Sequence, residues 1–462
     1  MSSRKATHEL NLTRRGLLAA GSVATLAALA PHAYAWVPAD DKLRIGSIGV
    51  GGRGGANTNG VASQHIAAIC DTNPEALAAA GKRYTDAKKY TDWRELLEQD
   101  DLDAIVCSTA DHHHAPVSVA AMRKGLHVYC EKPLGHTAWE ARLMQDVYNN
   151  RKDKIHTQMG TQIHATNNYR RVVELVQSGA VGDILEAHVW CSRSIKKINE
   201  NQIRLPEEPV PGGFDWDAWL GPAAGRPYNT AYWKGGNLNW NRRWDFGNGV
   251  LGDMGSHLID LPCWALKLRD PMSVQSEGPE PDDHTCPPWQ VVTWEHPERE
   301  NDGNPPAPCK VVWYHGPEGM KRRAERLQPM VGDDTDINKW GIGVAFVGNG
   351  GVLVADYGKY VLSPSAKFKG FKAPEQSIPK SKSHYNEWLA AIRGDGETLC
   401  NFDYSGKLIE HNMLGIAAHR SGGKKLEWDA EKFTFKNNAS ADQYLTKTYR
   451  EGWEIKPEPK NA

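Results

Sequence analysis

Short apolar runs separated by helix-patterned stretches mark the first third of the chain. Four runs are bounded by glycine, acidic or small polar residues, as buried parallel strands are: Leu43–Val50, His65–Cys70, Asp103–Ser108 and His127–Cys130. Segments between them, such as Pro116–Lys124, carry a helical pattern. Strand, helix, strand at this spacing is typical of a doubly wound parallel sheet, which binds its ligand at the carboxyl ends of the strands. We therefore predict an α/β protein that begins with a Rossmann sheet.

A second pattern starts near residue 160. The run Ile184–Cys191 alternates apolar and polar residues, and four later runs also have the character of strands: Val291–Trp294, Lys310–Tyr314, Gly341–Val347 and Val352–Asp356. They predict a C-terminal α+β domain with a large open, mostly antiparallel sheet, one face of which remains to be covered. The predicted domains are 36–160 and 161–440, with a Trp-rich insertion at 206–248 and a helix and tail at 441–462. Helices over His384–Arg393 and Lys407–Arg420 are expected to pack on the first domain.

Residues 1–35 have the features of an export signal. Arg14 and Arg15 precede an apolar stretch from Leu17 to Ala30, and Ala33-Tyr34-Ala35 follows. Paired arginines, a short apolar run and an A-x-A end resemble a twin-arginine signal cleaved after Ala35. As a helix the apolar run rises only about 21 Å, short of the roughly 30 Å hydrocarbon core. We expect a periplasmic or secreted protein without a membrane span in the mature chain; an uncleaved anchor is the alternative.

Composition excludes some partners. The 462 residues hold 55 Lys and Arg against 56 Asp and Glu, a net charge of -1. Such a balance gives no long-range field toward nucleic acid or an acidic membrane surface, so neither is expected as a partner. Three cysteines at the ends of strand-like runs are expected to be buried thiols: Cys70, Cys107 and Cys130. Cys286 and Cys309 flank a Pro-rich, charged stretch, and their pairing stays open. The wider segment Pro279–Pro308 is predicted to be a polar hairpin tip or mobile loop.

A glycine-rich loop follows the first predicted strand. It is a G-x-G-x-x-G motif made of Gly49, Val50, Gly51, Gly52, Arg53 and Gly54. Glycines permit a tight turn and close approach to a pyrophosphate, and the next helix supplies amide donors at its N-terminus. The second strand ends at Asp71, where this fingerprint has an acid for the ribose hydroxyls. An acid there repels a 2′-phosphate, so NAD is favoured over NADP.

Three further motifs carry a resemblance to a known family. They are the loop Ser108–His114, the step Glu131-Lys132-Pro133, and the segment Gly249–Asp260 with its D-x-x-x-H spacing. Together with the glycine loop they resemble the glucose–fructose oxidoreductase / inositol dehydrogenase / MocA family. The insertion is similar to an exported bacterial branch. Ala110 departs from the family's usual proline.

The resemblance implies an NAD-dependent oxidoreductase of carbohydrates or polyols that forms homo-oligomers, dimers or tetramers, built sheet against sheet. It implies a cofactor pocket lined by four residues beyond the glycine loop: Thr109, Asp111, His114 and Glu131. It also assigns catalytic roles to Lys132, Asp253 and His257.

The chemistry of these three side chains supports that implication. Asp253 and His257 share one face of a predicted helix at their i, i+4 spacing. Alcohol oxidation needs a base and a cation that stabilises the alkoxide. His257 suits the first role and Lys132 the second, with Asp253 as an orienting group. Some family members use the lysine as the base instead.

Further side chains are candidates for the substrate. Gln162, His164 and Tyr169 follow the fifth apolar run, and Trp240 and Trp244 lie in the insertion. The insertion either arches over the site and stacks sugar rings or buries its own aromatic residues as a surface loop. The three consecutive histidines His112–His114 point in different directions, so no metal site is expected.

Export and a nicotinamide cofactor together constrain the reaction. A periplasmic enzyme has no NAD pool, so we expect a tightly bound cofactor that is restored in every cycle. Two schemes satisfy this: oxidation of one sugar with reduction of a second compound, or transient oxidation that permits elimination and water addition at a glycosidic bond. The second scheme needs another acid or base, for which the sequence offers Tyr169, His164 and Tyr232 without choosing among them. A non-catalytic sugar-binding relative is the third alternative.

Overall fold

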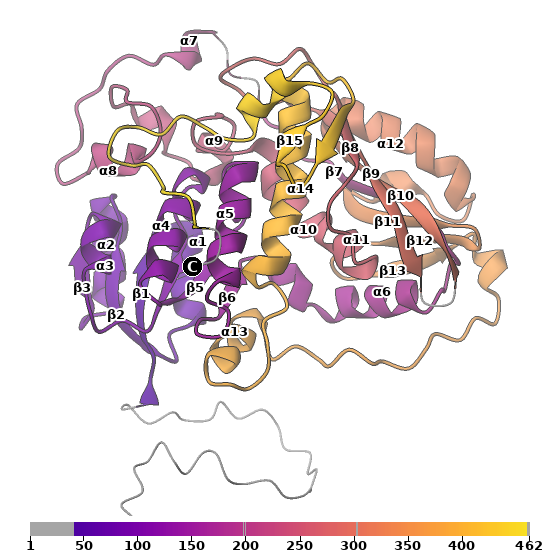
Figure 1. Cartoon of the computed structure of the whole chain (residues 1–462), viewed down its shortest axis with the longest axis horizontal. Coiled ribbons are helices and arrows are strands. Elements are labelled where there is room, and N and C mark those ends of the chain that lie inside the picture. Colours follow the sequence, from indigo (N-terminus) through magenta and orange to yellow (C-terminus); the bar gives the residue numbers. More distant parts are fainter. Residues whose placement is uncertain (1–40, 197, 199, 302–303, 460–462) are drawn as a thin grey trace, which may run out of the picture. The chain divides into compact units, whose positions relative to one another are not determined.

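The computed structural model describes residues 41–459 except 197, 199 and 302–303 (Figure 1). The predicted export signal at 1–35 lies outside the described residues. From Lys42 onward the chain forms one compact unit that contains two sheets.

The first sheet is the predicted Rossmann sheet. Its six parallel strands lie in the order β3-β2-β1-β4-β5-β6. The strands are β1 (Arg44–Ile48), β2 (His65–Cys70), β3 (Lys88–Tyr90), β4 (Ala104–Cys107), β5 (His127–Cys130) and β6 (Thr157–Met159). Their helices are α1 (Gly52–Gly60), α2 (Pro74–Arg83), α3 (Trp93–Leu97), α4 (Asp111–Arg123) and α5 (Ala138–Asn149). The strand order changes direction between β1 and β4, and such a crevice is where doubly wound sheets bind ligands.

The second sheet has nine strands in the order β13-β12-β11-β7-β10-β9-β8-β14-β15. They are β7 (Ile184–Cys191), β8 (Ser273–Glu277), β9 (Gln290–Asn301), β10 (Asn304–His315), β11 (Ile342–Gly348), β12 (Gly351–Ala355), β13 (Tyr360–Ser363), β14 (Leu426–Asp429) and β15 (Thr434–Phe435). All pairs are antiparallel except β7 with β10. This agrees with the predicted mostly antiparallel sheet. The segment 279–308, predicted as a hairpin tip or mobile loop, instead comprises a stretch before β9, the whole of β9 and the start of β10, apart from residues 302–303, which are not described.

Both faces of this sheet are packed against helices. Along β10, Val311 and Trp313 enter the cluster shared with α6 (Asn167–Gln177) and α14 (Phe402–Arg420), whereas Val312 and Tyr314 enter a cluster with α12 (Gly316–Val331). This is the two-residue alternation of a strand buried on both sides. Helix α12 contacts β7, β9, β10 and β12. Our expectation of an uncovered face was therefore wrong at these strands, and the homo-oligomer stays a prediction without that premise.

The C-terminal third returns to the first sheet, as predicted. Helix α13 (His384–Ile392) inserts Trp388 into the core beside Tyr129, and α14 packs along α5 (Figure 1). The expected helix at 441–462 is reduced to one 3-10 turn, η8 (Ala439–Tyr444), beyond which the described chain is irregular. Cys286 is a free, buried thiol that donates to the Asn241 carbonyl, so it forms no disulfide with Cys309.

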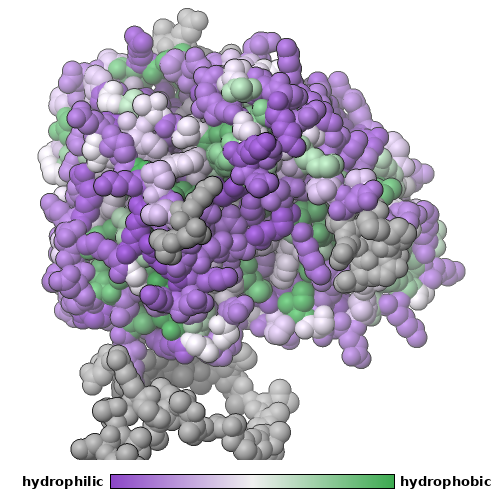
Figure 2. All heavy atoms as spheres, viewed as in Figure 1, coloured by the Kyte–Doolittle hydropathy of each residue, from purple (hydrophilic) through white to green (hydrophobic). Residues whose placement is uncertain are grey.

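The exterior face in Figure 2 is mainly hydrophilic, and its apolar residues are scattered rather than gathered in one broad patch. Among the described residues, no helix combines the length and the apolar character needed to cross a bilayer.

Candidate active site

A cavity of about 850 Å³ opens at the carboxyl ends of the parallel strands. Its walls come from the glycine loop, from the loops after β2, β4 and β5, and from the chain that follows β6. Of the predicted site residues it brings together Gly49, Gly51, Gly52, Arg53, Gly54, Asp71, Thr109, Asp111, His114, Glu131, Lys132, Gln162, Trp240, Asp253 and His257. Motifs that are far apart in the sequence thus line a single cavity.

The glycine loop has the shape that a pyrophosphate requires. Gly49 has φ 77°, and a Cβ there would lie 2.6 Å from the Ser108 carbonyl oxygen. A Cβ on Gly54 would overlap the carbonyl oxygen of Gly49. Helix α1 begins at Gly52 without an acidic residue in its first turn, so the amide donors of that turn and the positive dipole end suit a phosphate. These residues fit a dinucleotide.

Asp71 holds this loop in place. Its Oδ2 accepts hydrogen bonds from the amides of Val50 at 2.9 Å and Gly51 at 3.1 Å, and its Oδ1 accepts one from Asn73 at 2.9 Å. Burial raises the pKa of Asp71 above its ordinary value, against the effect of the three amides. The carboxyl group lines the cavity where the fingerprint places the ribose hydroxyls.

Glu131 joins the cofactor side of the cavity to its substrate side. Its Oε1 accepts from Arg53 at 3.1 Å, Asn57 at 2.9 Å and Gln162 at 2.8 Å. Burial acts to raise the pKa of Glu131, but Lys132 and Arg53 outweigh it and hold the pKa below its usual value. Gln162 is therefore fixed at the cavity wall by a carboxylate rather than by solvent.

Lys132 and Asp253 form an ion pair in the lining of the cavity. The Nζ of Lys132 contacts Oδ1 of Asp253, and the guanidinium of Arg193 contacts Oδ2. Burial acts to lower the pKa of Lys132, but Asp253 and Glu131 raise it above the ordinary value. Burial acts to raise the pKa of Asp253, and Lys132 lowers it. At neutral pH both groups are charged.

His257 stands beside this pair as a neutral imidazole. Burial, followed by the charge of Lys132, lowers the pKa of His257 to about 4. Its Nδ1 is buried and has no hydrogen-bond partner among the described residues. Asp253 lies in a π-helical turn, Leu251–Gly255, and His257 in the following α10 (Ser256–Leu258). The predicted shared face holds, although the turn is wider than an α-helix.

His114 couples the two loops that flank the cofactor cavity. Its Nδ1 donates to the Pro133 carbonyl at 2.6 Å, and its Nε2 lies 3.1 Å from the Thr109 carbonyl. Nearby, the Oδ2 of Asp111 is buried without a partner among the described residues. Burial raises the pKa of Asp111 well above its usual value.

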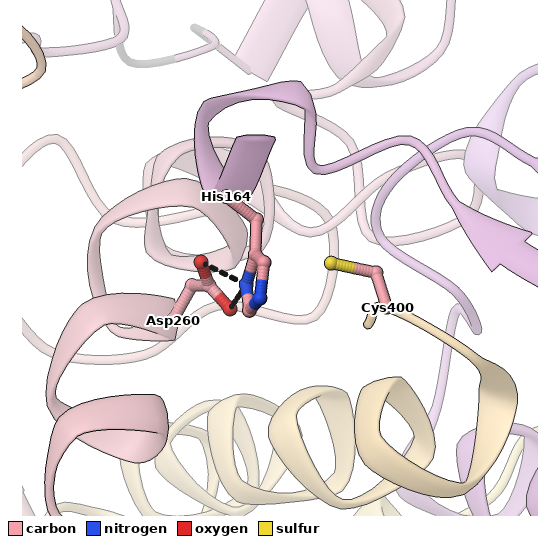
Figure 3. A group of neighbouring side chains, drawn as sticks. All are labelled: His164, Asp260 and Cys400. Atoms are coloured by element: carbon pink, nitrogen blue, oxygen red, sulfur yellow. Dashed lines mark hydrogen bonds and ion pairs between the residues drawn. The ribbon is translucent and has the colours of Figure 1, made fainter. Parts of the chain in front are cut away.

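His164 does not line the cavity, contrary to our prediction. It is buried, its Nδ1 lies 3.0 Å from both carboxylate oxygens of Asp260, and its ring stacks on Trp264 at 3.7 Å. Figure 3 shows the imidazole between this carboxylate and the sulfur of Cys400. His164, Asp260 and Cys400 are residue types that can bind a metal ion, and one ligand atom from each lies within 4.8 Å of the other two. Asp260 already accepts hydrogen bonds from His164 and from the Tyr404 hydroxyl, so this is a hydrogen-bonded cluster behind the active site.

Three other aromatic candidates also lie outside the cavity lining. Tyr169 is buried and donates its hydroxyl to the His257 carbonyl at 3.0 Å, so it supports the catalytic turn from behind. Trp244 is buried and donates its Nε1 to the Asp282 carbonyl at 3.0 Å. Tyr232 belongs to an internal core of the insertion with Leu220 and Phe246.

The insertion at 206–248 both buries aromatic residues of its own and contributes aromatic residues to the cavity, so both interpretations from the sequence hold in part. Its own aromatic core is buried, while Trp219, Trp233 and Trp240 reach the cavity. Sequence reasoning missed several polar lining residues, among them Arg193, Asn237 and Tyr357. Arg193 and Tyr357 each lie just beyond the end of a strand, which is a signal that could have found them.

A parallel nucleotide-binding sheet, with a lysine from its own loop and an Asp/His pair from a second domain in one cavity, defines a nicotinamide-dependent oxidoreductase class. Two family models agree. An oxidoreductase family with an NAD-binding Rossmann fold matches residues 43–159, and the C-terminal alpha/beta domain of the same oxidoreductase family matches 165–304, together more than half of the chain. The chain therefore belongs to the Gfo/Idh/MocA oxidoreductase family.

Curated relatives include a levoglucosan dehydrogenase of Pseudarthrobacter phenanthrenivorans, 26% identical over 236 residues, covering 47% of this chain and 50% of the relative. An inositol 2-dehydrogenase of Corynebacterium glutamicum is 29% identical over 182 residues, covering 38% and 54%. A glycosyl hydrolase family 109 protein of Stenotrophomonas maltophilia is 27% identical over 243 residues, covering 48% and 50%. The chain thus spans about half the length of these relatives.

Solved structures share the fold. The WlbA dehydrogenase from Bordetella pertussis, in complex with NADH and UDP-GlcNAcA, has a TM-score of 0.57 at 15% identity, with 84% of this chain and 99% of that chain covered. A levoglucosan dehydrogenase in complex with NADH and levoglucosan has a TM-score of 0.52 at 19% identity, with 83% and 99% covered.

Proposed function

We propose that this chain is an exported NAD-dependent oxidoreductase that acts on a hydroxyl or keto carbon of a sugar, polyol or glycoside. The observation that carries the proposal is the convergence of Lys132, Asp253 and His257 on one wall of the cavity that begins at the glycine loop. Relatives named as levoglucosan and inositol dehydrogenases support the substrate class.

The charge states of the three side chains set their roles. When bound, the nicotinamide supplies a site that accepts a hydride from carbon and returns it. Neutral His257 accepts the hydroxyl proton, because its pKa of about 4 leaves the imidazole unprotonated. Cationic Lys132 lowers the pKa of the substrate hydroxyl and stabilises the alkoxide. Asp253 raises the pKa of Lys132, which favours the lysine as the cation rather than as the base.

A redox-neutral glycosidase or lyase is the second candidate. Elimination needs another proton donor, and Tyr169, His164 and Tyr232 lie outside the cavity lining. The cavity offers Tyr357 and Asp111 instead. The Tyr357 hydroxyl and Asp111 Oδ2 are buried without partners among the described residues, and burial raises the pKa of both groups. The glycosyl hydrolase family 109 relative supports this alternative.

Substrate panels and two variants test the proposal. The purified protein is incubated with free sugars, polyols and glycosides, and products and nicotinamide absorbance are followed. Lys132→Ala and His257→Ala are expected to abolish turnover while leaving bound nucleotide intact; the exposed Lys367→Ala serves as the matched control. Near-normal turnover in either active-site variant would refute the assignment.

Export is proposed on the sequence of residues 1–35 alone. Replacing Arg14 and Arg15 together by lysine, followed by cell fractionation, tests it: the exported fraction should fall sharply. An unchanged fraction outside the cytoplasm would contradict a twin-arginine route.

A further inference from the structure

Part of the insertion lies over the nucleotide end of the cavity. Helix α8 (Trp216–Leu220) and the two residues before it place Phe214, Ala218 and Trp219 on the wall that also contains Asp71 and Asn73. The Asp215 amide donates to the Thr72 carbonyl at 3.2 Å. Because the loop after β2 is the ribose end of a Rossmann site, this wall faces the adenosine half of the dinucleotide.

Two histidines of α4 form hydrogen bonds to the backbone of α8. The Nε2 of His112 and the Nε2 of His113 both donate to the Trp219 carbonyl, at 3.0 and 2.9 Å. Burial lowers the pKa of both rings, so they act as neutral donors. Gly221 has φ 49°, and a Cβ there would overlap the His113 ring. The contact between α8 and α4 is therefore tightly packed.

The C-terminal segment fastens α8 from the other side. Arg450 donates from Nε to the Gly221 carbonyl and from Nη2 to the Asp217 carbonyl, both at 2.8 Å, and also pairs with the Asp217 carboxylate. Trp453 packs edge-on against Trp93 with ring centroids 6.2 Å apart, and the guanidinium of Arg94 lies 4.0 Å from its ring centroid.

The same segment is anchored upstream. Lys447 pairs with buried Glu140 of α5 at 2.8 Å. In Figure 1 the yellow C-terminal ribbon passes beside α8 and then returns toward the helices of the first sheet. Residues 447–453 thus connect α8 to α3, α4 and α5, and we call residues 213–221 with 447–453 the clasp.

We propose that the clasp encloses the adenosine half of NAD and makes the cofactor a resident group that is not exchanged between turnovers. Departure past α8 would break its hydrogen bonds to α4 and to Arg450 together. This inference rests on the proposed NAD-dependent function and deepens it: the net reaction must return the cofactor to its starting state. The substrates are then a donor and acceptor pair, or one glycoside that is oxidised and reduced again.

The test measures cofactor dissociation without any sugar. The full-length protein, loaded with NADH, is mixed with excess NAD, and the loss of bound NADH fluorescence gives the dissociation rate. Arg450→Ala and Trp453→Ala are expected to raise this rate at least about tenfold. Asp217→Asn, on an exposed side chain, is expected to raise it less and to leave the fold intact. The matched control is Arg326→Ala on α12, which removes an ion pair with Glu186 of β7, away from the clasp, and should leave the rate unchanged.

The outcomes separate this inference from the proposed function. NADH that stays bound through the chase in the wild-type protein and leaves faster in Arg450→Ala and Asp217→Asn supports the clasp, whether or not a sugar is turned over. If the wild-type protein releases NADH faster than it turns over, the clasp proposal is wrong even if sugars are oxidised. The proposal is also wrong if all the clasp variants release NADH at the wild-type rate. If Arg450→Ala fails to fold, hydrogen exchange at residues 216–221 decides: protection must increase when NADH is bound.

Discussion

Asp253→Asn gives the sharpest test of the charge arrangement in the active site. Asp253 pairs with both Lys132 and Arg193, and the side chains of Lys132 and Asp253 are only 15% and 6% exposed. Removing one partner of a buried pair costs about 3–5 kcal/mol when the remaining charge stays in place. Lys132 avoids part of this cost by losing its proton, because the burial that lowers its pKa is no longer offset by Asp253.

Two measurable consequences follow for the variant. Loss of the cation that stabilises the alkoxide should lower kcat by about 10²–10³ at pH 8. Activity should also decline as pH rises through the new, lower pKa of Lys132, whereas the wild-type lysine stays charged there. In the wild-type protein the raised pKa contributes stability that is present below the ordinary value of 10.5 and is lost only as pH rises through the folded-state pKa.

In Asp253→Asn, the effect of Lys132 on the pH dependence of the unfolding free energy changes sign. A folded-state lysine pKa below the unfolded value means that the unfolded chain binds more protons between the two values, so stability rises with pH in that range. Urea unfolding and kcat, measured from pH 6 to 9.5 in the same buffers, check both effects. Asp270→Asn, which removes a partner of Lys407 away from the cavity, is the matched control. A kcat within threefold of wild type and an unchanged pH profile would refute the reasoning.

Three further predictions are independent of that variant. Activity should hold down to pH 5 and fall only as pH drops through about 4, because His257 must stay neutral; an acid limb near 6.5 in kcat/KM would contradict the role of burial. Gly54→Ala should abolish nucleotide binding, since its Cβ would overlap the Gly49 carbonyl, whereas Gly225→Ala, whose Cβ meets open space, should bind normally by nucleotide content. Tyr357→Phe should lower glycoside cleavage by about 10²–10⁴ while hydroxyl oxidation persists if this phenol is the proton donor for elimination; equal loss of both activities would count against that role.

Sequence reasoning placed site residues correctly where they directly follow the end of a parallel strand. The carboxyl ends of parallel strands meet at one edge, so Asp71, Thr109 and Lys132 could be placed in a shared cavity from the strand pattern alone. Asp253 and His257 were assigned by the resemblance of their segment to the family's D-x-x-x-H motif, and their i, i+4 spacing then indicated a shared helix face. The strand pattern alone would not have identified them.

The errors arose where the fold decides which side of an element is buried. His164 and Tyr169 follow the fifth apolar run as Gln162 does, but the packing of Trp264 and Tyr404 draws His164 behind the catalytic turn. Helix α12 covers a sheet face that the strand pattern left open. No short-range signal distinguishes the lining Trp240 from Trp244, because Arg420 and Asp282, far along the chain, bury Trp244.

The clasp links the two proposals about cofactor and export. Its two halves, residues 213–221 and 447–453, are distant in sequence and meet over the first sheet, so it closes only after nearly the whole described chain has been made. A twin-arginine route carries folded proteins, and the clasp would let NAD enter in the cytoplasm before it closes and remain bound afterwards. The clasp would retain the cofactor wherever the protein is located. An exported protein without the clasp, however, would release NAD into a compartment that cannot replace it. Retention of NAD is thus the property on which the proposed activity outside the cytoplasm depends.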